Sequence, residues 1–512
     1  MVCQYKKRAC LWLVNVVWSP LIIVLFTQPV LGQTRQKTVT QDALVGYLSH
    51  TVDAQSLSDM VLHPSRFYPG TTDVIVPQEY YTGSFAPCEI AAIRREDVQS
   101  GRAWARYQQQ LAFVQRVQPR MMIDAITLWG TWEMDEHLAR ARHLVADLKT
   151  AVPGIVVMGT PCEWVNEGIV RGRLIPPYVW AAFGLLDENR PFDCLKMRDS
   201  LSETARGNGF IPQIQHLETQ LYFYWLATTY LQLGCEAISF SATNTLGSPS
   251  DYPAEWSRVV HRIRAYADTC PAVRFGLITG HSATGFLDTS GTLLFDFHME
   301  PLRPSEDPRN TAYPVGPNGG ACILEPAPQC PTLYQNGLGG MNPNGWVCTR
   351  NPGLMFFDNF LEPDRSSPAS EFERYGQPHP VRRRQRWQCW SPYHFDEISW
   401  FALQTKAYRD SFLRYAHYRV HQLDSALYLA LPMKRSVAAS TDKYAEYTCD
   451  GGDHYHARDW WPANYCAVDP DSVFPDPPRV GNYFFAPPDR TRLPLWGGYG
   501  QEAVIKELLN KP

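Results

Sequence analysis

Two acids that follow short apolar runs have the clearest potential for chemistry. Glu163 lies in "GTPCEWVNE" and Asp358 lies in "LMFFDNF". Two carboxyl groups can cleave an acetal, one as the proton donor to the leaving oxygen and one as the nucleophile or the base that activates water. Such groups lie about 5–5.5 Å apart in retaining enzymes and about 6.5–9.5 Å apart in inverting enzymes. We therefore predict Glu163 as the general acid and Asp358 as the nucleophile or base.

A second group of polar residues alternates with apolar residues in "LLFDFHMEP" (293–301). Side chains of a strand alternate between two faces, so Asp296, His298 and Glu300 would share one face, which we expect to look toward the active-site mouth. Asp296 and His298 are predicted to take part in catalysis, with His298 assisting proton transfer. The alternative is a metal-dependent hydrolase that uses His281, Asp296 and His298. Three such positions span about 13 Å, and no HExxH motif occurs, so we predict neither a metal nor another cofactor.

Other polar and aromatic residues near the ends of the apolar runs are predicted to bind substrate. Sugars stack their apolar C–H faces on aromatic rings, while their hydroxyls bond to acidic, amide and imidazole groups. The 16 Trp and 26 Tyr residues fit this chemistry, although many rings are expected to fill the core. The predicted substrate-binding residues are Trp129, Glu133, Glu167, His216, Glu218, Asn244, His281, Glu300, Arg303, Asn359 and Trp390.

The elements that must position these residues alternate between apolar strand-like runs and amphipathic helical runs. The expected strands are 72–78, 121–129, 154–160, 209–216, 235–241, 273–280, 292–299, 354–360 and 426–433. The expected helices are 101–118, 133–151, 218–234, 254–270 and 396–423. Repeated strand–helix alternation predicts parallel strands joined by right-handed crossovers.

This pattern predicts an α/β fold, specifically a (β/α)8 TIM-type barrel whose functional residues lie at the carboxyl ends of the strands. The competing arrangement is an open doubly wound sheet, but no glycine-rich phosphate loop follows the first strand. Nine candidate strands compete for eight places. Because only twelve residues, "GHSATGFLDTSG", separate 273–280 from 292–299, the latter run is expected to belong to an excursion after the sixth strand.

Two irregular segments accompany the predicted barrel. A Gly/Pro/Cys-rich loop insertion covers about 301–353, and a C-terminal extension at 436–512 is expected to pack on the barrel. The barrel itself is assigned to 72–435, after an N-terminal lead-in at 33–71. Cys322, Cys330 and Cys348 in the insertion, and Cys449 and Cys466 in the extension, are expected to form disulfides, because we predict an exported chain.

The first residues have the order of a secretory signal peptide. Lys6, Lys7 and Arg8 precede a mainly apolar run at 11–26, and Gly32 precedes the expected cleavage point. The alternative is an uncleaved membrane anchor. Residues 1–32 are therefore predicted to be removed, with a secreted or periplasmic product and no later membrane span. The formal charge of −4, with no long basic tract, argues against a nucleic-acid partner.

In architecture, residues from about Thr72 to Met433 resemble secreted (β/α)8 glycoside-hydrolase-type proteins. The resemblance rests on "MMIDAITLWGTWE", "GTPCEWVNE", "GCEAISFS", "LLFDFHMEPLR" and "FFDNF". It implies a secreted enzyme that cleaves a poly- or oligosaccharide with a carboxylate pair. In many such barrels an Asn–Glu pair closes the fourth strand, whereas Asn166 and Glu167 here follow the third expected strand. A carbohydrate-binding barrel without catalysis is the alternative, beside the metal-dependent hydrolase.

Overall fold

The computed structural model describes residues 37–61, 101–128, 134–199, 209–306, 322–325, 334–358, 397–403, 405–448, 454–474 and 496–511. The chain divides into two compact units, residues 1–34 and 35–512, and all described residues belong to the second unit. In the described part of the chain, no helix combines the length and the apolar character that crossing a bilayer requires.

A mixed α/β architecture is built around an eight-stranded sheet with the order β17-β16-β15-β1-β2-β3-β6-β7. Every neighbouring pair from β15 to β7 is parallel, and β16 is antiparallel to β15. The strands are β1 (Thr51–Ala54), β2 (Met121–Thr127), β3 (Val156–Thr160), β6 (Ala237–Phe240), β7 (Leu277–Gly280), β15 (Leu431–Thr448), β16 (His454–Cys466) and β17 (Trp496–Gly498). The parallel part is consistent with a TIM-like fold.

A second sheet has the order β14-β13-β8 and is also parallel. Its strands are β8 (His298–Pro301), β13 (Gly353–Phe356) and β14 (Leu427–Leu429). Two links join this sheet to the first one. Only Ala430 separates β14 from β15, and His281, directly after β7, forms an isolated parallel bridge with Met299 of β8.

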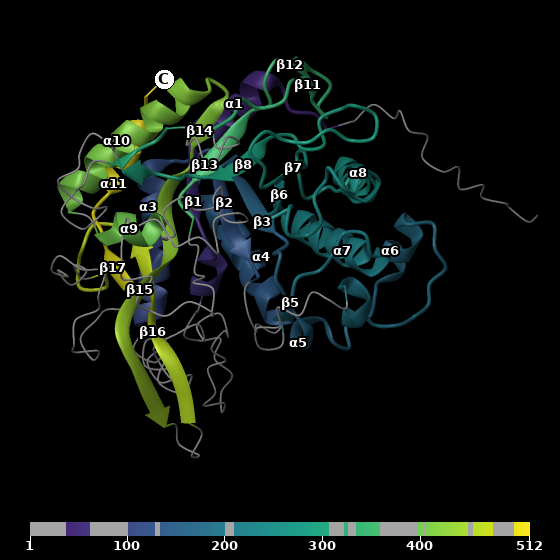
Figure 1. Cartoon of the computed structure of the whole chain (residues 1–512), viewed down its shortest axis with the longest axis horizontal. Coiled ribbons are helices and arrows are strands. Elements are labelled where there is room, and N and C mark those ends of the chain that lie inside the picture. The colour runs from purple at the N-terminus through teal and green to yellow at the C-terminus, as the bar shows by residue number, and fades with distance from the viewer. Residues whose placement is uncertain are drawn as a thin grey trace, which may run out of the picture. The chain divides into compact units, whose positions relative to one another are not determined.

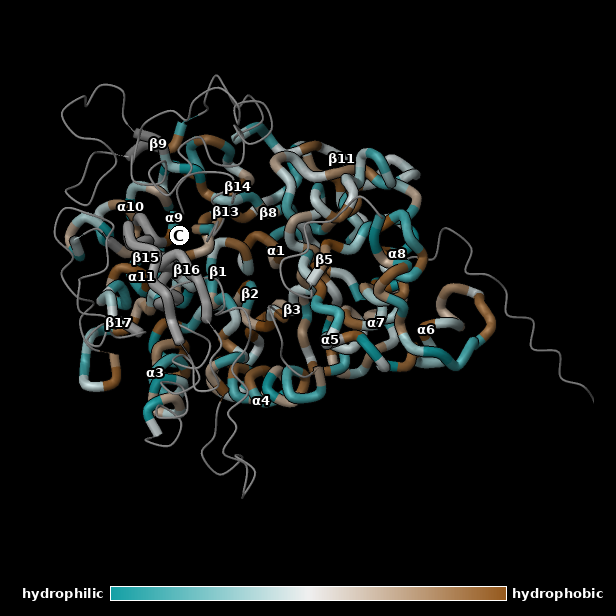
Figure 2. The backbone as a smooth tube through the Cα atoms, turned by 60° about the horizontal axis from the view of Figure 1, so that its bottom comes forward, coloured by the Kyte–Doolittle hydropathy of each residue, from teal (hydrophilic) through white to brown (hydrophobic). Residues whose placement is uncertain are grey.

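Helices cover the outer faces of the strands. They are α3 (Arg102–Val117), α4 (Met134–Ala151), α7 (Leu217–Leu233), α8 (Pro253–Thr269), α9 (Glu397–Leu403), α10 (Lys406–Leu423) and α11 (Glu502–Leu509). In Figure 1 strands β1, β2 and β3 lie between α7 and α8 on one side and α3, α10 and α11 on the other. Figure 2 shows apolar segments along the central strands and mixed polar and apolar segments along α4. Amphipathic helices of this kind bury one stripe against a sheet.

Apolar side chains at alternate positions along the strands point to opposite faces and belong to two different clusters. One cluster contains Met121 and Ile123 of β2, Leu277 of β7, Met299 of β8 and Leu354 of β13, together with residues of β3, β6 and β14. It also receives residues of α1 (Gln41–Leu48). The intervening residues of the same strands, such as Met122 and Met355, pack with the helices in the larger cluster. Strands buried on both faces are typical of parallel α/β sheets.

Helix α7 is buried on nearly all sides, because 13 of its 17 residues are buried. An excursion between β3 and α7 covers its outer side and contains β4 (Val165–Asn166), α5 (Glu167–Val170), α6 (Pro177–Ala182), a 3-10 turn at Cys194–Met197 and β5 (Gly209–Phe210). The Thr219 hydroxyl donates to the Met197 carbonyl at 2.9 Å, and the hydroxyls of Tyr178 and Thr228 lie 3.2 Å apart. The aromatic composition of α7 therefore serves packing, as its sequence predicted.

Most of the expected elements agree with the structure within a few residues. Helices α3, α4, α7 and α8 and strands β2, β3, β6 and β7 coincide with predicted runs. The run 209–216 differs, because only Gly209–Phe210 is a strand and it pairs antiparallel with β4 outside the main sheet. Strand β1 was not predicted and lies in the expected lead-in, whereas the expected strand at 72–78 lies outside the described residues.

The insertion and the C-terminal region differ in part from the expectation. Short strands occupy the described parts between β8 and β13: β9 (Ser305–Glu306), β10 (Cys322–Ile323), β11 (Gly340–Met341) and β12 (Val347–Cys348). The expected boundary at residue 435 falls inside β15, which continues to Thr448. Helix α11 packs against α3 and α10, and Arg116 of α3 bonds to Glu502 at 2.5 Å.

The described cysteines do not support the predicted disulfides. Six of them are buried with free thiols, namely Cys162, Cys194, Cys235, Cys270, Cys348 and Cys466. Cys348 instead lies 3.6 Å from the Gly340 carbonyl within the β11–β12 pair. The predictions for Cys330 and Cys449 lie outside the described residues.

Candidate functional site

The buried guanidinium of Arg435 brings together three acids that are far apart in the sequence. Its Nη1 lies 2.6 Å from Asp53 Oδ2 and 3.5 Å from Asp124 Oδ2, and its Nη2 lies 3.6 Å from Asp358 Oδ1. These residues lie in or directly after β1, β2, β13 and β15. The Arg435 side chain is only 2% exposed, whereas those of Asp124 and Asp358 are 12% and 21% exposed. The carboxylates of Asp124 and Asp358 are therefore more exposed than the cation they share, whereas Asp53 is fully buried.

Asp358 is held in its ionised form by two cations. Burial alone would raise its pKa, but the charges of Arg303 and Arg435 outweigh burial and lower the pKa below the ordinary value of an aspartate. Arg303 Nη2 lies 3.3 Å from Asp358 Oδ2, and Arg303 also pairs with Glu397 of α9. An ionised, partly exposed carboxylate suits the role of nucleophile or base, because either role requires a free electron pair.

Glu163 has a different environment, although it also follows a strand of the sheet. The Ser241 hydroxyl, directly after β6, donates to Glu163 Oε2, and the Cys162 thiol lies 3.4 Å from the same oxygen. Both partners are neutral, and Glu163 is half-buried. Next to it, Trp164 packs over Gly209 of β5, where a Cβ atom would collide with the indole. The close approach of Trp164 to Gly209 fixes the turn that carries Glu163.

His281 follows β7 and interacts with the acids from several strands. Burial lowers its pKa below the ordinary value, while the charges of Asp124, Asp358 and Glu163 partly oppose that decrease. Its ring centroid lies 5.0 Å from that of Phe356. A histidine with a lowered pKa is neutral at pH 7, so its ring can both donate and accept hydrogen bonds.

Asp53 and Asp124 complete the cluster, and the sequence analysis assigned no role to either. Burial raises the pKa of Asp53 to about 7, although Arg435 lowers it. Asp124 has a positive φ of 53° at a register irregularity of β2, and its Oδ1 accepts the Thr160 hydroxyl at 3.1 Å. Aspartate tolerates this conformation better than most residues do. The available sequence signal was an acid inside an apolar run, "TVDA" and "MMIDAIT".

The three alternating residues of "LLFDFHMEP" lie differently from the expectation. Met299 packs in the smaller apolar cluster, which also contains Met121 and Leu277, so His298 and Glu300 of β8 point to the opposite face of the strand. Within the described chain, neither ring nitrogen of His298 has a hydrogen-bond partner, and burial lowers the pKa of His298 to about 4. Burial raises the pKa of Glu300 to about 8. The predicted polar face toward the mouth was therefore wrong, because alternation defines two faces without telling which one is inside.

Asp296 is fully buried and connects three parts of the fold. Its Oδ2 accepts the Ile278 amide at 2.7 Å and Arg264 Nη2 at 3.1 Å, and its Oδ1 accepts Asn344 Nδ2 at 2.7 Å. Asn344 Oδ1 in turn accepts the Val39 amide at 3.0 Å. These contacts support a structural role for Asp296 in place of the predicted catalytic one.

The Asp296→Asn variant is expected to lose about 3 kcal/mol of folding free energy, because the buried Arg264 loses its carboxylate partner. Its kcat at a temperature where it is folded should equal that of the wild type. Thermal denaturation and steady-state kinetics measure the two effects. A variant with wild-type stability and no activity would return Asp296 to the catalytic residues.

The other predicted site residues lie outside this cluster. Glu218, at the first turn of α7, accepts two hydrogen bonds from Arg190 at 2.8 and 2.9 Å. His216 precedes α7 and lies 2.7 Å from Asp199, while Asn244 is an exposed turn residue. Trp129, Glu133, Asn359 and Trp390 lie outside the described residues. Among the described side chains, no group of three or more His, Cys, Asp or Glu residues is arranged to hold a metal ion.

Comparisons with known proteins give weak structural similarity only. No family model and no curated protein matches the sequence. A debranching enzyme from Nostoc punctiforme aligns over 50% of this chain and 52% of its own, at 13% identity and a TM-score of 0.26. The glycoside hydrolase domain of PelA from Pseudomonas aeruginosa aligns over 42% and 69%, at 9% identity and a TM-score of 0.22. The type III pullulan hydrolase from Thermococcus kodakarensis aligns over 49% and 46%, at 11% identity and a TM-score of 0.26.

The chain thus spans about half of the length of the debranching enzyme that it matches. These similarities are too low to carry an argument about this chain. The function proposed below therefore depends on the geometry of the site.

Proposed function

We propose that this protein is a glycoside hydrolase that cleaves a poly- or oligosaccharide, with Glu163 as general acid and Asp358 as nucleophile or base. The observation that carries the proposal is the contrast between these two carboxyl groups. Asp358 is kept ionised by Arg303 and Arg435, whereas Glu163 contacts the neutral groups of Ser241 and Cys162. Both also interact with His281. Titratable groups in contrasting environments support a division into acid and base.

The reaction needs one proton donor and one ionised carboxylate. Glu163 gives its proton to the glycosidic oxygen while the bond from that oxygen to the anomeric carbon breaks. Asp358 either attacks the anomeric carbon or removes a proton from the water that attacks it. In the first case water later releases the sugar and returns the proton to Glu163. In the second case Asp358 gives its new proton to solvent and Glu163 takes up a proton from solvent, which restores both groups. His281 is suited to bind a sugar hydroxyl beside the two acids.

We further infer that the two sheets form one closed (β/α)8 barrel. Three observations support this closure. Only Ala430 separates β14 from β15, His281 forms a bridge with Met299, and the smaller apolar cluster contains residues from strands of both sheets. Closure would order eight parallel strands as β1, β2, β3, β6, β7, β8, β13 and β14–β15. The carboxyl ends of parallel strands lie at one rim of such a barrel, the side that carries catalysis in this architecture.

Export of the protein remains a proposal that depends on the sequence of residues 1–32. Cleavage after Gly32 would leave the described unit intact, since its first described residue is Lys37. A secreted or periplasmic enzyme would meet polysaccharides outside the cell.

A panel of polysaccharides with different linkages tests the proposed reaction by release of reducing ends. The wild type should hydrolyse one class, and Asp358→Asn should reduce kcat by about 10²–10³-fold through loss of a charge at the reacting carbon. Wild-type activity should persist below the ordinary pKa of aspartate, because the pKa of Asp358 is lowered and the group ionises earlier as the pH rises.

The matched control is Asp135→Asn, whose carboxylate is 83% exposed and pairs with Arg173 at the surface. It should keep wild-type kinetics. Full activity of Asp358→Asn would contradict the assigned pair, and binding of a glycan without any turnover would leave a carbohydrate-binding protein.

A further inference from the structure

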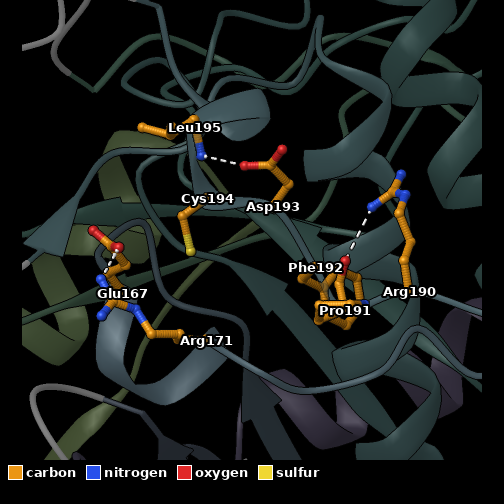
Figure 3. A pocket seen from close by; sticks show the side chains of 8 residues that line it. All are labelled: Glu167, Arg171, Arg190, Pro191, Phe192, Asp193, Cys194 and Leu195. Atoms are coloured by element: carbon orange, nitrogen blue, oxygen red, sulfur yellow. Dashed lines mark hydrogen bonds and ion pairs between the residues drawn. The ribbon is translucent and has the colours of Figure 1, made fainter.

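A concave pocket lies on the excursion that carries Glu163. Figure 3 shows Glu167 and Arg171 on one side of it and Arg190, Pro191 and Phe192 on the other, with Asp193, Cys194 and Leu195 between them. Its volume is about 340 Å³. This volume is within the range of small-molecule sites in proteins, at its lower end.

The wall around Arg190 is held in place before any ligand binds. Its guanidinium donates to both oxygens of Glu218, at 2.8 and 2.9 Å, and lies 4.9 Å from the ring centroid of Trp180. Phe192 packs against Tyr222 and Trp225, with ring centroids 5.7 and 5.5 Å apart. A preformed wall reduces the entropy that binding would cost.

The charged groups of the pocket are already neutralised by partners. Glu167 pairs with Arg171, Arg190 pairs with Glu218, and Asp193 lies 3.6 Å from the ammonium of Lys196. An ionic ligand would have to break one of these pairs. A neutral ligand with several hydroxyls can instead bond to the outer edges of the same groups, because a guanidinium has five donors and a carboxylate about four acceptor positions.

The rim of the pocket also offers apolar surface. Leu195 is 70% exposed, and Pro191 is exposed as well. Apolar surface beside a pair of charged, planar groups fits a sugar ring, which has a C–H face and a hydroxyl-bearing edge.

We propose that this pocket binds a neutral sugar unit of the substrate chain, away from the bond that is cleaved, with Glu167 and Arg171 as the hydroxyl-binding residues. The inference rests on the proposed function. Glu167 lies four positions after Glu163, so their Cα atoms are at most about 14 Å apart. A glycan of eight sugar units that occupies the catalytic carboxyl groups is long enough to reach the pocket as well.

Binding measurements by calorimetry on the full chain test this subsite separately from catalysis. The probes are neutral maltose and cellulose fragments, each as a disaccharide and as an octasaccharide, with glucosamine and glucuronate octamers as charged comparisons. The Arg171→Gln and Glu167→Gln variants should raise the Kd of the preferred neutral octasaccharide about ten-fold, as expected for hydrogen bonds to charged groups. The Kd of the disaccharide should not change.

The control Arg116→Gln removes a partly exposed ion pair between α3 and α11, and this variant should bind like the wild type. Four results would each overturn the subsite. They are equal Kd values for wild type and both pocket variants, equal weakening of disaccharide and octasaccharide binding, tighter binding of a charged octamer, and no binding of any neutral probe to the wild type. If the variants lose octasaccharide binding while the wild type hydrolyses no glycan, the subsite stands and the proposed function fails. If hydrolysis proceeds with the same kcat/KM in wild type and variants, the function stands and the subsite fails.

Discussion

Replacing Glu163 by glutamine is expected to lower kcat on an unactivated glycoside by about 10²–10⁴-fold, the usual contribution of a general acid. The substitution keeps the size of the side chain and its contacts with Ser241 and Cys162, but it removes the proton that the leaving oxygen requires. Stability should change little, since Glu163 is half-buried and its hydroxyl and thiol partners are neutral.

The leaving group separates an acid from a residue that only binds substrate. An aryl glycoside whose phenol is a weak base needs no proton to depart, so Glu163→Gln should retain far more activity on it than on the natural glycoside. Steady-state kinetics on both substrates measure this ratio, with the surface substitution Glu507→Gln as the control. An equal loss of kcat on both substrates would exclude Glu163 as the acid.

Replacing Arg435 by methionine is expected to cost about 3–5 kcal/mol of folding free energy, because it leaves buried acids without their cation. Asp53 is fully buried and lies 2.6 Å from the guanidinium. Burial already raises the pKa of Asp53 to about 7, and removal of Arg435, which opposes this, would raise that pKa further.

The pH dependence of this loss has a definite sign. An acid whose pKa is higher in the folded than in the unfolded state keeps its proton longer when folded, so stability falls as the pH rises between the two values. The stability difference between Arg435→Met and wild type should therefore be larger at about pH 8 than at about pH 5. Denaturant unfolding at both pH values measures it.

Two further variants complete the comparison. The double variant Asp53→Asn with Arg435→Met should recover part of the stability, because the uncompensated buried charge is gone. Arg414→Met, which breaks an exposed pair with Glu507, should cost about 1 kcal/mol or less. An Arg435→Met protein as stable as the wild type at both pH values would contradict this account of the cluster.

Local patterns in the sequence predicted most elements of the fold. Helices α3 and α4 have apolar residues at helical spacing, and β2 and β3 are apolar runs bounded by polar residues. Strand β1 was missed because its four residues are too few to form a pattern. Its identity as a strand comes from pairing with β2 and β15, which is tertiary information.

The sequence analysis could name residues of the cluster only where they follow a recognisable strand. Glu163, His281, Arg303 and Asp358 were named by this rule, and their roles stay predictions. Asp53 and Asp124 lie inside strands, where an acid in an apolar run does not reveal which cation it will meet. Arg435 is 382 residues from its partner Asp53, and no local rule relates the two.

The pairing of β1 with β15 also determines when folding of the main sheet can be completed during synthesis. Strand β1 is synthesised early, whereas its neighbour β15 is synthesised only after most of the chain. Contacts between such distant segments form slowly, and the edge of β1 that pairs with β15 stays open to aggregation in the meantime. The main sheet therefore cannot be completed until β15, near the end of the chain, has been synthesised.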